Sequence, residues 1–113
     1  MSTTRMLIAE VHGLAGRERE LGQLLADLSA GAQGEAGCLR FLVLSDAEPG
    51  EFVVVAHWRD EAAQRAHYAG PAYARYRAAV GELLARPSDV DLHLVTETLR
   101  AADPNPPDPG MFG

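Results

Sequence analysis

The residues best suited to chemistry gather in one segment, HWRDEAAQRAHYAGPAYARY, at residues 57–76. It contains the only tryptophan of the chain, Trp58, followed by His67 and by all three tyrosines. An imidazole titrates near neutral pH, so His67 can accept a proton from a phenol or from an activated C–H bond. The electron-rich anion that results can react with dioxygen without a metal. The alternative is that His67 is a structural histidine, with satisfied hydrogen bonds, where a helix meets a sheet.

The aromatic residues around this histidine also have two interpretations. A lone tryptophan at a strand end, such as Trp58, is usually a core anchor, and it can also form a flat wall for an aromatic substrate. Tyr73 and Tyr76 share a helix face with apolar residues, which favours packing. A phenol hydroxyl at the edge of a pocket can nevertheless orient a substrate oxygen. These three residues are the candidate substrate contacts, whereas Tyr68 is expected to point away from His67.

Arg77 lies on the same helix as the last two tyrosines, and its guanidinium can reach an anionic oxygen of a substrate. The alternative is a solvated side chain. Among the other histidines, His57 is expected to face the opposite side of its strand from the tryptophan. His12 and His93 are expected on outer strands, with no carboxylate or cysteine at metal-ligand spacing. No metal site is predicted.

Apolar periodicity predicts the strands and helices that position these side chains. Runs of β-compatible residues predict strands at 5–13, 38–46, 51–59 and 89–97. The Ala-Glu-Pro-Gly spacer between the second and third runs predicts an antiparallel hairpin.

Two helical segments separate the strands. The first runs from residue 17 to glycines at 31 and 34, and four leucines at positions i, i+3, i+4 and i+7 mark its apolar face. The second begins after an N-cap at Asp60, is interrupted at Gly70–Pro71 and continues at helical spacing to Leu84. The order is β-α-β-β-α-β, a ferredoxin-like α+β fold with an antiparallel sheet backed by helices. Residues 1–100 are predicted to form this domain, followed by an extended or disordered proline-rich tail at 101–113.

The strands predict a homodimer, because they are apolar on both faces. Helices cover only one face of such a sheet, and the simplest cover for the other is the sheet of a second copy. The third strand has one face formed by Phe52, Val54, Ala56 and Trp58 and another formed by Val53, Val55 and His57. In the second strand Leu39, Phe41 and Val43 are expected to oppose Leu42 and Leu44.

Composition excludes several classes of protein. The chain has 113 residues and a net charge of −6, which argues against a nucleic-acid partner because such partners need a basic patch. Its apolar runs are too short to span a membrane, and no signal peptide is evident, so a cytoplasmic location is expected. The single cysteine, Cys38, excludes an intrachain disulfide and is expected to be a small buried residue.

Several motifs resemble the antibiotic biosynthesis monooxygenase family: EAGCLR at 35–40, FVVVAHW at 52–58, and His67 with GPAY at 70–73. The resemblance extends over roughly residues 5–97 and implies a dimeric α+β barrel built from two ferredoxin-like domains. It also implies oxidation of a small aromatic, quinol-like or polyketide-derived substrate by dioxygen, with no cofactor.

The chain departs from the family pattern at several positions. Haem-degrading members have an asparagine, a tryptophan and a histidine where this chain has Val11, His67 and Arg77, which argues against haem. Many members carry a glutamate where this chain has Ala56. Two other functions stay open on the same scaffold: a non-catalytic dimer that binds a small ligand, and an isomerase that uses His67 for proton transfer.

Overall fold

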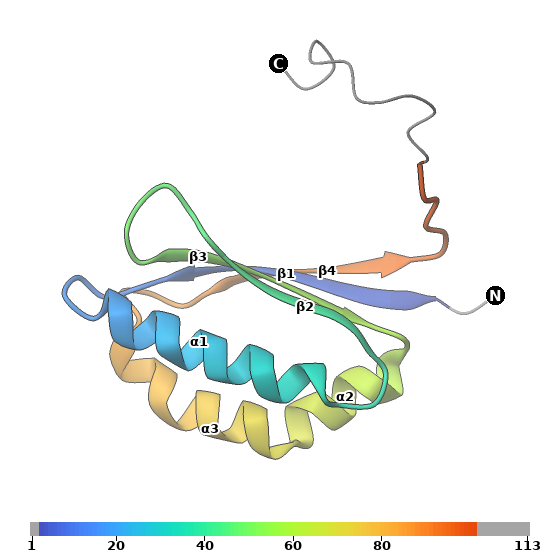
Figure 1. The fold of residues 1–113 in the computed structure, drawn as a ribbon, viewed down its shortest axis with the longest axis horizontal. Helices are drawn as coiled ribbons and strands as arrows, with labels where there is room; N and C mark the ends of the chain where they lie inside the picture. Colours follow the sequence, from blue (N-terminus) through green and yellow to red (C-terminus); the bar gives the residue numbers. More distant parts are fainter. Residues whose placement is uncertain (1–2, 102–113) are drawn as a thin grey trace, which may run out of the picture.

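The computed structural model describes residues 3–101 and contains four strands, three α-helices and one 3-10 turn. The elements in chain order are β1 (Thr4–His12), α1 (Glu18–Gln33), β2 (Cys38–Ser45), β3 (Glu51–Trp58), α2 (Glu61–Ala69), α3 (Pro71–Val80), η1 (Gly81–Leu83) and β4 (Asp89–Val95). The strands form one antiparallel sheet in the order β2-β3-β1-β4. The ferredoxin-like α+β prediction is confirmed. Figure 1 shows all three helices on one side of the sheet.

The boundaries of α2 and α3 follow from local chemistry. Asp60 caps α2, because its Oδ1 accepts a hydrogen bond of 2.8 Å from the backbone N–H of Ala63. Gly70 ends α2 in an extended conformation and also caps α3, which begins with Pro71. Continuation of the α-helix to Leu84 was a wrong expectation, since α3 ends at Val80 and the next turn tightens to a 3-10 helix. A glycine at this point weakens the α-helix and permits the change.

Helix α1 packs against α3 at a site where only glycine fits. A Cβ built on Gly31 would lie 2.7 Å from the Cβ of Ala72 on α3, which is closer than real side chains approach. Ala72 is itself buried. The absence of a side chain at Gly31 therefore sets how closely α1 and α3 approach, and Gly31 lies inside the helix rather than ending it. The chain leaves α1 at Gly34.

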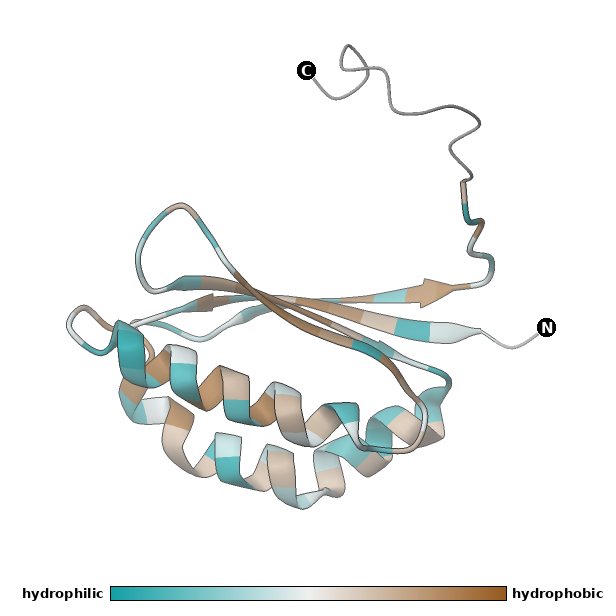
Figure 2. Ribbon diagram, viewed as in Figure 1, coloured by the Kyte–Doolittle hydropathy of each residue, from teal (hydrophilic) through white to brown (hydrophobic). Residues whose placement is uncertain are grey.

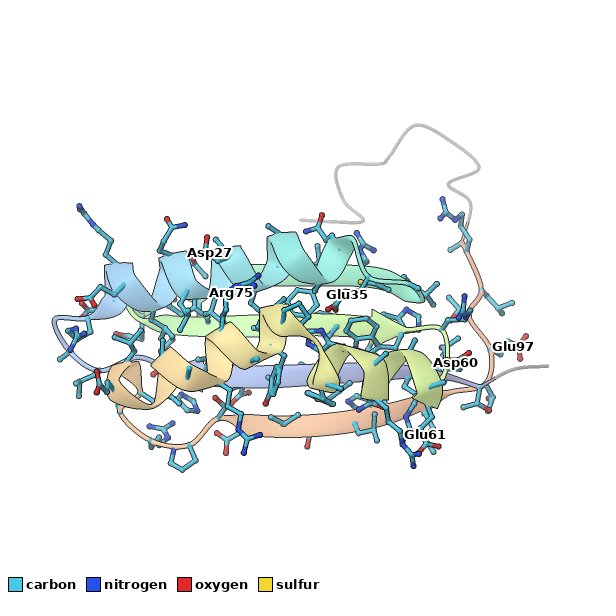
Figure 3. All side chains as sticks on the ribbon, turned by 90° about the horizontal axis from the view of Figure 1, so that it is seen from below. Asp27, Glu35, Asp60, Glu61, Arg75 and Glu97 are labelled. Atoms are coloured by element: carbon cyan, nitrogen blue, oxygen red, sulfur yellow. The ribbon has the colours of Figure 1, made fainter. Side chains whose placement is uncertain are left out.

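The hydrophobic core lies between the helices and the sheet. Trp58, Leu21 and Leu25 are fully buried there, and burial of each such side chain contributes about 1.5–3 kcal/mol. Seen from the helix side, the helices cover β2, β3 and β1 and leave β4 outside them (Figure 3). The side chains of β4 that point to this side, Val90 and Leu92, are consequently 53% and 44% exposed.

No helix lies over the second face of the sheet, and much of the ribbon of its strands has the colour of hydrophobic residues (Figure 2). The strand pairing places Ile8 beside Val55, and Val55 beside Leu42. In the same way Val53 lies beside Leu44, which is 49% exposed. We call this surface the outer face; it is formed by Met6, Ile8, Leu42, Leu44, Val53 and Val55. The predicted two-sided apolar character of these strands is confirmed.

One residue does not follow the predicted alternation. A register shift between Cys38 and Arg40 removes Leu39 from the row of Phe41, and Leu39 is 52% exposed. Within residues 3–101, no helix combines the length and the apolar character needed to cross a membrane. The predicted tail lies almost wholly outside the described residues.

Candidate functional site

A cavity of about 160 Å³ lies between the sheet and the helices. Its side chains come from all three helices and all four strands, so the fold as a whole shapes it. Most of the lining is apolar or aromatic. The lining residues are Leu7, Ala9, Val11, Leu25, Leu28, Phe41, Val54, Ala56, Trp58, His67, Tyr68, Tyr73, Tyr76, Ser88 and Val90. The exposed members, Tyr68 and Val90, mark its mouth beside β4.

His67 occupies the last turn of α2, and only 4% of its surface is exposed. Its Nδ1 lies 2.6 Å from Oε1 of Glu35, which follows the end of α1. Among residues 3–101 no hydrogen-bond partner is found for Nε2, and the ring lines the cavity. The buried imidazole thus has one nitrogen held by a carboxylate and one nitrogen free for a ligand.

Aromatic rings surround this imidazole. The indole of Trp58 lies 4.6 Å from the His67 ring, centroid to centroid, at an interplanar angle of 30°. Tyr73 and Phe41 follow at 5.5 Å and 5.9 Å. Trp58 is 0% exposed, so it is both the core anchor and part of the cavity wall. The structure brings together the four residues that were expected to form a group. All of them line this cavity: Trp58, His67, Tyr73 and Tyr76.

Tyr68 differs from the expectation that it points away from the histidine. Its ring lies 5.4 Å from His67 and 4.8 Å from Tyr73, and it lines the cavity. Burial raises the pKa of the Tyr68 phenol and raises that of Tyr76 to about 12. Both phenols are therefore neutral near pH 7, and each can donate a hydrogen bond.

Arg77 is the one candidate that the structure leaves out of this group. It is exposed on α3 and does not line the cavity, as expected for a solvated side chain. Among the lining side chains in the described part of the chain, there is no Arg, Lys, Asp or Glu. Cys38 lies outside the lining, and burial raises the pKa of its thiol. The cavity therefore offers a neutral aromatic surface with one titratable nitrogen.

Sequence reasoning missed Glu35. It precedes His67 by 32 positions, in a turn, so no local pattern connects the two. The sequence indicated only a tight turn at this place. In the structure the Cys38 N–H donates to the Glu35 carbonyl, and Gly37 has φ of 80°. A four-residue turn of this kind requires glycine at its third position. Glu-Ala-Gly-Cys therefore identifies a tight turn but does not identify where the glutamate points.

His12 also differs from expectation. It lies on β1, an inner strand, and is 4% exposed. Its Nδ1 lies 2.6 Å from Glu51 on β3, and its Nε2 lies 2.8 Å from Asp89 on β4. The expectation of no carboxylate nearby was wrong, because β-pairing joins residues distant in sequence.

The pKa of His12 is raised by its hydrogen bonds to two carboxylates. The bond to Asp89 has the largest effect, followed by the bond to Glu51. Glu10 completes the only group of described residues whose spacing suits a metal ion, Glu10, His12 and Asp89. Both ring nitrogens of His12 already have carboxylate partners. The cluster is therefore explained by these hydrogen bonds without a metal ion.

Comparisons with known proteins find a family model, a relative and solved structures that this chain resembles. A family model described as antibiotic biosynthesis monooxygenase matches residues 4–79. The chain is 37% identical over 67 residues to the Mycobacterium tuberculosis protein named "Putative monooxygenase Rv0793". That match covers 59% of this chain and 66% of the relative.

Two solved structures share the fold over nearly their whole length. The structure of Rv0793 superposes with a TM-score of 0.77 at 30% identity, covering 88% of this chain and 99% of that one. PA3566 from Pseudomonas aeruginosa superposes with a TM-score of 0.79 at 28% identity, covering 86% of this chain and 98% of that one.

Proposed function

Because the chain belongs to the antibiotic biosynthesis monooxygenase family, we propose that it oxidises a small aromatic substrate with dioxygen, without a metal or flavin. The observation that carries the proposal is the His67 imidazole, which lines a cavity walled by aromatic rings and whose Nε2 has no hydrogen-bond partner among residues 3–101. A base in an apolar, aromatic enclosure suits a phenol or hydroquinone that must lose a proton before it reacts.

The size of the cavity narrows the substrate to a single ring. A cavity of roughly 150 Å³ lined by apolar side chains binds benzene, and this one measures about 160 Å³. The lack of a cation in the described lining disfavours carboxylated or phosphorylated compounds. A neutral hydroquinone with small substituents therefore fits better than a tricyclic polyketide.

The reaction balances without an external reductant. His67 Nε2 takes a phenolic proton, and the phenolate donates electrons to dioxygen. A carbon–oxygen bond then forms at a ring carbon, giving a hydroperoxide. The hydroperoxide takes its proton from the protonated His67. His67 then removes the hydrogen of that ring carbon as a proton and passes it to the outer oxygen, which leaves as water as the O–O bond breaks, and the ring becomes a hydroxyquinone. The hydroquinone supplies all four electrons that reduce dioxygen.

Trp58 and Tyr73 would hold the ring flat beside the imidazole, at contact distances already present between the protein's own rings. The raised pKa of Tyr76 keeps its phenol neutral, so it can donate a hydrogen bond to the oxygen that becomes negative. Trp58, Tyr73 and Tyr76 are thus the proposed substrate contacts, and His67 the proposed base.

Oxygen uptake is the direct test. The protein is mixed with hydroquinone, methylhydroquinone, a naphthohydroquinone and an anthrone, and uptake is compared with product formation and with His67→Gln. The proposal expects one dioxygen per hydroxyquinone, label from ¹⁸O₂ in the product, and preference for the single ring. Melting shifts with these compounds, but no uptake, would instead establish a ligand-binding role. Proton exchange on a substrate without uptake would establish an isomerase.

We further propose that the protein is a homodimer joined through the outer face. Ile8, Val53 and Val55 form the centre of this apolar surface, which no described helix covers. A contiguous apolar patch of this kind on a small protein is typically an interface. A second copy is the simplest partner, since a two-fold axis places the same surface on both sides.

A further inference from the structure

The buried contact between Glu35 and His67 is the shortest link between the candidate base and the rest of the protein. Glu35 Oε1 lies 2.6 Å from Nδ1 of the ring, and the side chain of the glutamate is only 22% exposed. The titratable groups that contact this imidazole from the packed elements are Glu35, Tyr68 of α2 and Tyr73 of α3. Of these three, only the glutamate is a carboxylic acid.

An ionised carboxylate only accepts hydrogen bonds, so Nδ1 must carry the proton in this contact. A neutral imidazole has one N–H, and its second nitrogen then has a free lone pair. That nitrogen is Nε2, which is the one without a protein partner among residues 3–101. The contact with Glu35 therefore selects the tautomer in which Nε2, the nitrogen away from the carboxylate, is the acceptor.

Backbone hydrogen bonds and a close contact with the α2–α3 junction position Glu35. Residues 35–38 form a tight turn closed by the Cys38 N–H donating to the Glu35 carbonyl at 3.2 Å, and the Glu35 N–H donates to Ala32 at the end of α1. Its second oxygen, Oε2, lies against the α2–α3 junction, 3.2 Å from where a Cβ on Gly70 would be. Figure 3 shows Glu35 beside this junction. The turn and the missing side chain at Gly70 together fix the acceptor.

We propose that Glu35 is a positioning residue that fixes the tautomer of His67 and compensates the positive charge that the ring gains when it takes a proton. This inference rests on the proposed function for its catalytic consequence, but the tautomer follows from the contact alone. The described lining contains no Arg or Lys, and Glu35 is the carboxyl group that contacts the ring. Loss of its charge should therefore impair proton transfer more than substrate binding.

The tautomer is measured first, because it needs no substrate. Long-range ¹H–¹⁵N spectra of the uniformly labelled protein distinguish Nδ1–H from Nε2–H, and His67→Gln assigns the signal. The wild type should show the Nδ1–H tautomer. Glu35→Gln should shift the population toward Nε2–H, since the amide can turn its NH₂ group to Nδ1. Glu48→Gln, a surface change in the β2–β3 hairpin, is the matched control and should change nothing.

Steady-state kinetics on the best hydroquinone then test the consequence. Glu35→Gln should lower kcat on the order of 10–10⁴-fold, the range seen when an orienting group behind a histidine is changed, with KM nearly constant. Glu35→Asp, which keeps the charge, should recover part of the loss. An Nε2–H tautomer in the wild type, or a Glu35→Gln protein with unchanged tautomer and kcat, would overturn the proposal. Should the tautomer behave as expected while no compound is oxidised, the proposed function fails and the positioning role stands.

Discussion

The Trp58 indole and the His67 imidazole lie face to face, 4.6 Å apart between centroids and 30° from parallel. One ring ends a strand and the other ends a helix, and both are almost fully buried. Trp58 belongs to the hydrophobic core, and His67 is the candidate base of the cavity. Changing the first ring therefore tests packing and substrate binding, and changing the second tests proton transfer.

Replacing His67 by Gln should abolish most turnover and leave the fold intact. Gln can keep a hydrogen bond to Glu35 but cannot act as a base near neutral pH. Oxygen uptake should fall on the order of 10²–10⁴-fold, the usual contribution of a positioned general base. His93→Gln on the exposed side of β4 is the control. A wild-type rate in His67→Gln would show that this residue is not the base.

Replacing Trp58 by Phe should weaken the core and the binding of substrate. The indole is 0% exposed, and the smaller ring leaves a void that costs about 1–3 kcal/mol, less than full truncation would. The expected kinetic effect is a rise in KM with a smaller change in kcat. Urea denaturation and oxygen-uptake curves measure the two effects separately. A KM equal to that of the wild type would place the substrate away from this wall.

Introducing a charge on the outer face should split the proposed dimer. Val53→Asp or Val55→Asp would bury an unpaired carboxylate if a second copy covers this surface. Light scattering should then report a monomer or an unfolded chain, whereas Ala30→Asp on the exposed side of α1 should leave the dimer unchanged. A wild-type protein that is monomeric at micromolar concentration would contradict the prediction at the outset.

Stability should decline at alkaline pH because of His12. Its folded-state pKa is raised by Asp89 and Glu51, with Glu10 also near and Arg86 opposing the shift. The stabilisation is then complete below the unfolded value of about 6.5 and is lost as pH rises through the higher folded value. A neutral ring can donate to only one of its two carboxylates.

The test of this pH dependence compares denaturation midpoints from roughly pH 6 to pH 9, a span that includes the titration of histidine. The wild type should lose stability across the range, and His12→Gln should be less stable at the acidic end with a flatter profile. Glu48→Gln, an exposed change in the β2–β3 hairpin, should keep the wild-type slope. Parallel profiles for the wild type and His12→Gln would assign the pH dependence to other groups.

The packing of α1 on α3 predicts opposite outcomes for two glycines. Gly31→Ala should destabilise the protein by about 1–3 kcal/mol, because the new methyl group meets Ala72 and overpacking costs more than the gain in helix propensity. Gly34→Ala meets no atom closer than 3.7 Å and should be tolerated. Thermal unfolding compares the two. A Gly31→Ala protein at least as stable as the wild type would mean that the helices separate at little cost.

The sequence predicts the elements well where their causes are local. Asp60 as a cap, the break at Gly70–Pro71 and the two-sided apolar strands each depend on neighbouring residues, and all three are confirmed. The cluster of Trp58, Tyr73 and the histidine follows from one short segment and is likewise found together.

Contacts between distant residues could not be predicted in the same way. The partners of His12 lie 39 and 77 positions away, and Glu35 lies 32 positions from His67. Periodicity gives the face on which a side chain lies, but strand order and the angle between helices decide which faces meet. The predicted direction of Tyr68 was wrong for a similar reason. Its ring lies near Tyr73 of the next helix, and this contact depends on how α3 follows the end of α2.

The position of β4 outside the helices affects whether copies of the protein associate through their sheet edges at high concentration. It is an edge strand with a free row of backbone donors and acceptors and with Val90, Leu92 and Leu94 exposed. Asp89, Asp91 and His93 alternate with them. Two such edges that paired directly would bring carboxylates of the same sign together. The alternation thus opposes open-ended growth of the sheet into fibres while leaving the apolar row available beside the mouth of the cavity.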